Sequence, residues 1–261
     1  MDRHDFTGWT ILVTRPRAQA EGLARRIEAL GGKAFRFPTI EILPARNPDS
    51  VRARLLRLED FHIAVFVSTN AVEHALALLA AERLPPGLML AAPGAATARE
   101  LAAHGYPDVL TPADRETSEG LAALPAMTAV RDRRIAILRG EGVGRDWLAE
   151  TLAGRGADVR YIECYRRLPA DANPAPLREA LDAGDIQAVI ATSVETLESL
   201  IRIVGDAMRA RLITLPIACA SERIGTQARL LGFRDVCIAA SASATALTDA
   251  LVAWRSARHA G

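Results

Sequence analysis

A repeat at a nearly constant offset restricts the fold of this chain more than any other feature. The stretch "TILVTRP" near the N-terminus has the same layout as "RIAILRG" in the middle, and each is followed by an amphipathic, helix-like segment. The aligned pairs are Ile11 and Ile135, Arg15 and Arg139, Gly32 and Gly156, and Phe37 and Tyr161, each 124 positions apart. This spacing predicts an alignment without a gap. A chain of 261 residues is long enough for two domains, so duplication predicts two related ones.

Two further segments also occur twice. "IAVFVSTNAVEHALALL" matches "QAVIATSVETLESLIRIV", with Val65 aligned to Val189 at the same offset of 124. "LMLAAPGAATARELAAHGYPDVL" matches "LPIACASERIGTQARLLGFRDVC" at an offset of 127, shown by Gly105 and Gly232. Short apolar strands alternate with helices in every segment, which favours an α/β fold with a doubly wound, parallel sheet in each half. Ligands bind such sheets at the carboxyl ends of the strands.

Small polar residues follow several predicted strands and begin the next helices. Such residues cap helices, and we expect capping boxes that join Thr192 to Glu195 and Asn70 to Glu73. The same helix starts also present free backbone amides that bind anions. Both roles stay open for these positions. The candidate ligand-binding residues at helix starts are Ser68, Thr69, Asn70, Gly94, Thr97, Ser118, Glu119, Gly120, Thr192, Ser193 and Ser221.

An arginine follows the first strand of each repeat, and in the second repeat it is followed by a glycine loop. Arg15 and Arg139 either form surface salt bridges or hold a ligand carboxylate with two hydrogen bonds. Arg17 is an alternative to Arg15. "RGEGVGR" contains Gly140, Gly142 and Gly144, but it does not match the G-x-G-x-x-G pattern of dinucleotide sites. A nucleotide-dependent enzyme stays an alternative because Glu163 lies near the place of the acidic residue in that pattern.

Composition excludes several function classes. The net charge of +1 gives no overall field to attract nucleic acid or a membrane. Three cysteines without a C-x-x-C pair predict buried thiols in a cytoplasmic protein. The N-terminus does not have the pattern of a signal peptide, and no run of about 20 apolar residues predicts a membrane span. We see no spacing typical of a metal site or of a serine or cysteine hydrolase.

Taken in order, the motifs resemble those of the uroporphyrinogen-III synthase family. The matching stretches are "ILVTRP", "VFVSTNAV", "APGAATARELAAHGY", "TSEGLAAL", "ILRGEGVGRDWLAETLAGRGADVRYIECYRR", "IATSVETLESL" and "ACASERIGTQARLLGF". They extend from about Trp9 to Trp254. Family members often carry a small hydroxyl residue early in the turn where this chain has Glu222 and Arg223, a departure from the pattern.

The resemblance implies two flavodoxin-like domains joined by a two-stranded β-ladder. Mapped onto this sequence, residues 1–36 and 169–261 would form a discontinuous first domain, 37–41 and 164–168 the linker strands, and 42–163 the second domain. Each domain would combine the first segment of one repeat with the other two segments of the other repeat.

The resemblance also implies the reaction. The substrate would be hydroxymethylbilane, a linear tetrapyrrole with carboxylate arms, and the product uroporphyrinogen III, formed with loss of water and inversion of the last ring. No metal or organic cofactor is implied. We expect a monomer with at most a transient contact to the preceding enzyme of the pathway. A hinged two-domain protein that binds or senses small anions is the alternative outside enzymes.

Tyr165 is the candidate catalytic residue. The motif "IECYRRL" places it where one half of the chain is followed by the other, and the resemblance includes a tyrosine at this position. A tyrosine on such a strand is either a packing residue or a phenol that faces the active site. In the second case it could donate a proton to the departing hydroxyl group.

Overall fold

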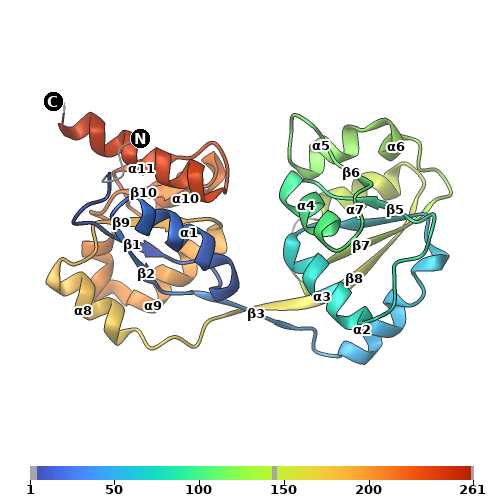
Figure 1. The fold of residues 1–261 in the computed structure, drawn as a ribbon, viewed down its shortest axis with the longest axis horizontal. Helices are drawn as coiled ribbons and strands as arrows, with labels where there is room; N and C mark the ends of the chain where they lie inside the picture. Colours follow the sequence, from blue (N-terminus) through green and yellow to red (C-terminus); the bar gives the residue numbers. More distant parts are fainter. Residues whose placement is uncertain (1–4, 143–145, 260–261) are drawn as a thin grey trace. The chain divides into compact units, whose positions relative to one another are not determined.

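The computed structural model describes residues 5–142 and 146–259, and the chain forms two compact units. Unit 1 consists of Met1–Glu41 and Leu168–Gly261, and unit 2 is the continuous stretch Ile42–Arg167. Each unit has its own parallel sheet with helices on both faces, in agreement with the predicted α/β fold class (Figure 1). The strand β8 (Asp158–Pro169) carries the chain across the boundary.

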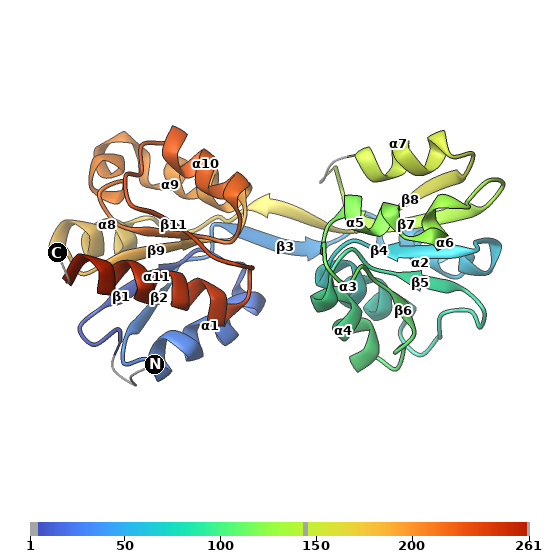
Figure 2. The ribbon, with the colours of Figure 1, turned by 90° about the horizontal axis from the view of Figure 1, so that it is seen from above.

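Unit 1 contains a five-stranded sheet in the order β11-β10-β9-β1-β2. Its strands are β1 (Thr10–Val13), β2 (Lys33–Arg36), β9 (Ala188–Ala191), β10 (Ile217–Cys219) and β11 (Val236–Ile238), and neighbouring strands pair in parallel. One face is covered by α8 (Ala175–Ala183), α9 (Val194–Leu212) and α10 (Glu222–Leu230). Helices α1 (Arg17–Ala29) and α11 (Ala244–His259) cover the other face (Figure 2).

Unit 2 contains a six-stranded sheet in the order β3-β8-β7-β4-β5-β6. The other strands are β3 (Ile40–Pro44), β4 (Ile63–Phe66), β5 (Met89–Ala91), β6 (Val109–Leu110) and β7 (Arg134–Gly140). One face packs against α2 (Pro48–Leu55), the 3₁₀ helix η1 (Leu58–Asp60), α3 (Thr69–Leu79) and α4 (Ala95–Ala103). The opposite face packs against α5 (Ser118–Ala123), α6 (Pro125–Thr128) and α7 (Trp147–Gly154) (Figure 2).

Each sheet combines strands from both repeats, an arrangement that the family resemblance implied. In unit 1, β1 and β2 of the first repeat lie beside β9, β10 and β11 of the second. In unit 2, β7 and β8 of the second repeat lie beside β4, β5 and β6 of the first. The colours of Figure 1 show this mixture, because blue strands pair with orange elements in unit 1. Apart from β3, the spatial order of the strands is therefore equivalent in the two units, and in unit 1 it is the flavodoxin-like order.

The sheet registers correct the predicted alignment of the repeats by one residue. Leu12 of β1 pairs with Val189, and Ala136 of β7 pairs with Ala64. If Leu12 corresponds to Ala136, then Val189 corresponds to Ala64 and not to Val65. The predicted pair Val65 and Val189 was wrong because those side chains pack on non-equivalent faces of the two sheets. A shift of one residue moves every side chain of a strand to the opposite face.

The extra residue of the second repeat falls between its first strand and its first helix. Gly31 and Gly156 have φ angles of 84° and 88°, and each follows the last residues of a helix. A left-handed residue at this place closes the helix end, and glycine adopts it without strain. The structural counterpart of Gly156 is thus Gly31, and the predicted match with Gly32 was wrong.

Candidate functional site

The carboxyl ends of the unit 2 strands bring Ser68 and Tyr165 together. Ser68 lies just after β4 and is the N-cap of α3, where its Oγ atom accepts the Ala71 N–H at 3.2 Å. The same Oγ atom lies 3.2 Å from the Tyr165 hydroxyl. The Tyr165 ring is only 3% exposed and stacks on the His74 ring at a centroid distance of 5.5 Å. Burial lowers the pKa of His74, which favours the neutral imidazole.

Gly140 provides the space that the Tyr165 ring occupies. A Cβ atom at Gly140 would lie 2.9 Å from the Cε2 and Cζ atoms of Tyr165, closer than carbon atoms can approach. The pairing of β7 with β8 is irregular at this point, and the Glu141 N–H donates to the Tyr165 carbonyl at 2.8 Å. The predicted loop glycine therefore has a packing role toward the candidate catalytic tyrosine.

Arg139 is surrounded by groups of the protein itself. Its side chain is 12% exposed, and its Nη1 atom lies 2.7 Å from Asp146 Oδ1 while Nη2 lies 3.6 Å from Glu163. The guanidinium also stacks on the Tyr161 ring, 3.8 Å from its centroid. Both acidic groups and the ring fix Arg139 beside the glycine loop.

The contacts around Arg139 shift the pKa values of two neighbouring side chains. The hydrogen bond from Arg139, and after it the one from the Tyr161 hydroxyl, lowers the pKa of Asp146. Burial, and then the hydrogen bond to Asp146, raises the pKa of Tyr161 to about 12. The Glu163 carboxylate also accepts the Gly142 N–H at 3.1 Å. Glu163 thus binds the loop itself, a contact that the nucleotide alternative did not foresee.

Arg15, the counterpart of Arg139 in unit 1, has a different environment. It follows β1, is half-buried, and donates from Nη2 to the Ala242 carbonyl. Within residues 5–142 and 146–259, no carboxylate lies in ion-pair range of its guanidinium. Burial alone lowers its pKa. Arg17, by contrast, is exposed at the first position of α1. Of the two arginines, Arg15 is therefore the half-buried cation without a counter-ion.

At two helix starts of unit 2, side chains outside the helix accept hydrogen bonds from its first backbone N–H groups. The Ala95 N–H, next to the N-cap Gly94, donates to the Glu116 carboxylate at 3.0 Å. Thr117, not Ser118, caps α5 by accepting the Gly120 N–H at 3.1 Å. Only glycine fits at position 120, because a Cβ atom there would lie 2.0 Å from the Arg115 carbonyl oxygen.

The corresponding helix starts of unit 1 differ from each other. Ser193 caps α9, and a capping box joins it to Thr196, so the predicted box with Thr192 and Glu195 was wrong by one residue. Ser221 is the N-cap of α10 but makes no capping hydrogen bond with its side chain. The predicted box of Asn70 and Glu73 is likewise replaced by the bond between Ser68 and Ala71.

The remaining predicted residues lie at or just inside the helix starts. Thr69 and Asn70 begin α3, Ser118 and Glu119 begin α5, Thr97 is buried in the first turn of α4, and Thr192 precedes the cap of α9. Gly144 lies outside the described residues. In the described part of the chain, no group of three or more acidic, histidine or cysteine residues could hold a metal ion. None of its helices is both long and apolar enough to cross a membrane.

Sequence reasoning missed three residues that shape these sites. His74, Glu116 and Asp146 contact Tyr165, the start of α4 and Arg139, respectively. The only signal for His74 was its position six residues after Ser68, on the predicted helix. Glu116 and Asp146 lie in loops, and loop conformation carries no periodic pattern that a sequence could display.

Comparisons with known proteins agree with the geometry. The model of the family described as "Uroporphyrinogen-III synthase HemD" matches residues 21–249. The uroporphyrinogen-III synthases of Salmonella typhimurium and Escherichia coli are each 34% identical to this chain, over 93% of its length and 99% of theirs. A crystal structure of mutant uroporphyrinogen III synthase from Thermus thermophilus matches with a TM-score of 0.65 at 19% identity, over 95% of this chain and 99% of that one. The Helicobacter pylori enzyme matches with a TM-score of 0.60 at 14% identity, over 94% and 99%.

Proposed function

We propose, on the premise that this chain belongs to the uroporphyrinogen-III synthase family, that it converts hydroxymethylbilane into uroporphyrinogen III. The single observation that carries the proposal is the match with relatives 34% identical over nearly their whole length. In the reaction, the terminal hydroxyl group of the bilane leaves as water, and the resulting cation is attacked by the last pyrrole ring. Attack through the substituted carbon of that ring forms a spiro intermediate, whose fragmentation and reclosure invert the ring.

Proton transfer is the step in which Tyr165 takes part. The leaving hydroxyl group accepts the phenol proton and departs as water. When the macrocycle recloses, the unsubstituted carbon of the last ring forms the new bond and loses its proton, and this proton restores the phenol. Support comes from the contact of the Tyr165 hydroxyl with Ser68 at 3.2 Å and from the ring's fixed position over Gly140. General acid help of this kind is typically worth about 10² to 10⁴ in rate.

Binding of the carboxylate arms is the role we assign to Arg15 and to the helix starts near Ser68, Gly94, Ser118, Thr192 and Ser221. Arg15 is half-buried without a counter-ion in the described residues, so a substrate carboxylate would complete its environment. Arg139 already contacts Asp146 and Glu163, and we assign it to holding the glycine loop. Holding a flexible polyanion in one conformation is the main source of isomer selectivity in this scheme.

A comparison of the alanine variants of Arg15 and Arg17 tests the binding part of the proposal. Arg15→Ala should raise KM for hydroxymethylbilane about tenfold or more, because a charge-assisted hydrogen bond to a half-buried group is lost. Arg17→Ala removes the same charge from an exposed position and should leave KM within about twofold. Equal effects of the two variants would refute the assignment of Arg15.

A coupled assay that reports the ratio of isomers III and I tests the activity itself. Isomer III should exceed isomer I throughout the reaction, because spontaneous closure of the bilane gives isomer I. If isomer I forms at the uncatalysed rate in the presence of the protein, the proposed activity is wrong.

We further propose that the protein acts as a cytoplasmic monomer with at most a transient contact to the enzyme that supplies its substrate. Cys164, Cys219 and Cys237 are all unpaired and buried, which suits a reducing compartment. The large exposed apolar residues Leu56, Met89, Trp147, Leu168 and Leu230 lie on separate parts of the chain. Sedimentation velocity at several protein concentrations measures the oligomeric state.

A further inference from the structure

A cavity of about 360 Å³ in unit 2 lies at the end of the sheet opposite to Tyr165. Its wall includes Arg134, the first residue of β7, and Asp158, the first residue of β8, whereas Gly140 and Tyr165 lie near the carboxyl ends of these strands. Arg134 and Gly140 are the first and last of the 7 residues of β7, which places them about 20 Å apart. The cavity is thus distinct from the site assigned above.

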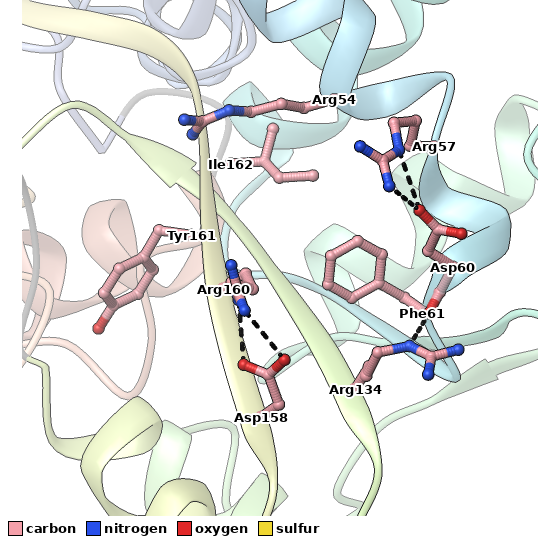
Figure 3. A pocket seen from close by; sticks show the side chains of 9 residues that line it. All are labelled: Arg54, Arg57, Asp60, Phe61, Arg134, Asp158, Arg160, Tyr161 and Ile162. Atoms are coloured by element: carbon pink, nitrogen blue, oxygen red, sulfur yellow. Dashed lines mark hydrogen bonds and ion pairs between the residues drawn. The ribbon is translucent and has the colours of Figure 1, made fainter.

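Four arginines face this cavity and only two carboxylates accompany them. Arg57 pairs with Asp60 at 2.8 Å, and Arg160 pairs with Asp158 at 3.0 Å. Both pairs are drawn as dashed lines in Figure 3. These two ion pairs cancel, so the charge of the cavity wall is set by the other two arginines.

Arg54 and Arg134 supply the uncompensated charge. Arg134 donates from Nε to the carbonyl of Asp60, which leaves its two terminal nitrogens directed elsewhere. For Arg54, the described residues provide no hydrogen bond or ion pair. Arg54 lies on α2 and Arg134 on β7, so elements that are distant in sequence line one cavity. Figure 3 shows their two guanidinium groups on opposite sides of the other lining residues. With four arginines and two aspartates, the cavity wall has a net positive charge, which favours the binding of an anion.

Apolar surface lies between the charged groups. Figure 3 shows the Phe61 ring between Arg160 and Arg134, with Ile162 nearby on β8. Phe61 is half-buried and packs on the core of unit 2, so its ring is held in place. An aromatic face bordered by guanidinium groups suits a flat ligand that carries anionic groups at its edge.

We propose that this cavity binds a small, flat organic anion with two or more carboxylate or phosphate groups. Arg54 and Arg134 bind the anionic groups, and Phe61 contacts the flat apolar body. The volume of the cavity is within the range of small-molecule sites. This proposal does not depend on the proposed enzymatic function, because none of these residues belongs to the site around Tyr165 or Arg15.

Calorimetric titration with benzene-1,3,5-tricarboxylate tests the proposal, with inorganic phosphate as a second probe. Arg54→Ala should weaken binding of the tricarboxylate about tenfold, because the lost interaction is charge-assisted but exposed to solvent. Arg52→Ala is the matched control, since it removes the same charge from the same helix outside the cavity wall. Arg15→Ala should retain this binding, which distinguishes it from binding at the substrate site.

Phe61→Leu tests the contact with the flat body of the ligand separately from the contacts with its anionic groups. It should weaken binding of the tricarboxylate and leave binding of phosphate unchanged, because phosphate has no flat body. Turnover of hydroxymethylbilane should be the same in Arg54→Ala as in the parent protein. The proposal is overturned if no tricarboxylate binds at millimolar concentration, or if Arg52→Ala and Arg54→Ala weaken it equally.

Discussion

The Tyr165 hydroxyl and the Ser68 Oγ atom lie 3.2 Å apart, and Ser68 Oγ also accepts the Ala71 N–H at the start of α3. A hydroxyl group has one proton to donate. Either hydroxyl group can donate in the contact between Ser68 and Tyr165, because Ser68 Oγ has a second lone pair beside the one that accepts the helix amide. When Ser68 donates, the phenol proton is directed away from Ser68 and can be donated to a ligand.

Replacement of Tyr165 by Phe tests this arrangement. The variant should fold normally, because the ring and its stacking on His74 are kept. Turnover should fall about 10- to 1000-fold, at or below the usual range for general acid help, since donation from the pyrrole nitrogen already drives departure of the hydroxyl group. Whatever is converted should still be isomer III, because ring inversion depends on the shape of the site.

Rate and isomer ratio in one assay separate the possible roles of Tyr165. If the Phe variant turns over like the parent, Tyr165 is a packing residue only. A variant that produces mainly isomer I by a catalysed route would assign Tyr165 to substrate orientation.

The contact between Gly140 and Tyr165 predicts a stability effect. Gly140→Ala should destabilise the protein by about 1–3 kcal/mol, because its Cβ atom would lie 2.9 Å from the ring and the ring would have to move. Gly22→Ala is the control: nothing lies within 4 Å of its Cβ position in α1, so alanine should stabilise the helix by about 0.5–1 kcal/mol. Urea denaturation measures both, and a Gly140→Ala protein as stable as its parent would contradict the packing role.

Replacement of serine by alanine at the starts of α9 and α10 should reduce the free energy of unfolding by different amounts. Ser193→Ala removes a side-chain cap and should reduce the free energy of unfolding by about 1 kcal/mol. Ser221→Ala removes no capping hydrogen bond and should have less than half that effect. Turnover should change little in either variant, because the backbone amides remain. Loss of all activity in Ser193→Ala would mean that the hydroxyl group itself binds substrate.

Burial of His74 predicts a specific dependence of stability on pH. The pKa of His74 is lowered from 6.5 in the folded protein, so the unfolded chain binds more protons as the pH falls through that value. The stability contributed by the neutral ring is therefore present above about pH 6.5 and is lost below it. His74→Gln should show a smaller loss of stability than the parent between about pH 7 and 5 in urea denaturation. Parallel pH profiles for the two proteins would show that His74 does not titrate with folding.

The order of strands and helices could be predicted from the sequence because it depends on periodic patterns. The alternation of buried strands and amphipathic helices predicted the doubly wound sheets, whereas the exchange of segments between repeats was implied by the family resemblance. The single-residue shift between Gly31 and Gly156 could not be detected, because adjacent glycines occupy both candidate positions in the first repeat. The backbone conformation decides which of the two glycines is the counterpart of Gly156, and it cannot be read from the residue types.

The details of the candidate site depend on contacts between distant residues. Ser68 and Tyr165 are 97 positions apart, and no local pattern relates them. The different environments of Arg15 and Arg139 were also hidden, because the two residues occupy equivalent places in the repeats. Their difference comes from Asp146 and Glu163, which surround only Arg139.

The exchange of segments between the repeats sets an order of folding during synthesis. Unit 2 is the continuous stretch Ile42–Arg167, so all strands of its sheet are available once that stretch has left the ribosome. In unit 1, β1 lies between β2 and β9, and β9 begins only at Ala188. β1 therefore gains its second neighbour only long after its own synthesis. We expect nascent chains to fold unit 2 first and to hold β1, paired only with β2, without its second neighbour until β9 has been synthesised.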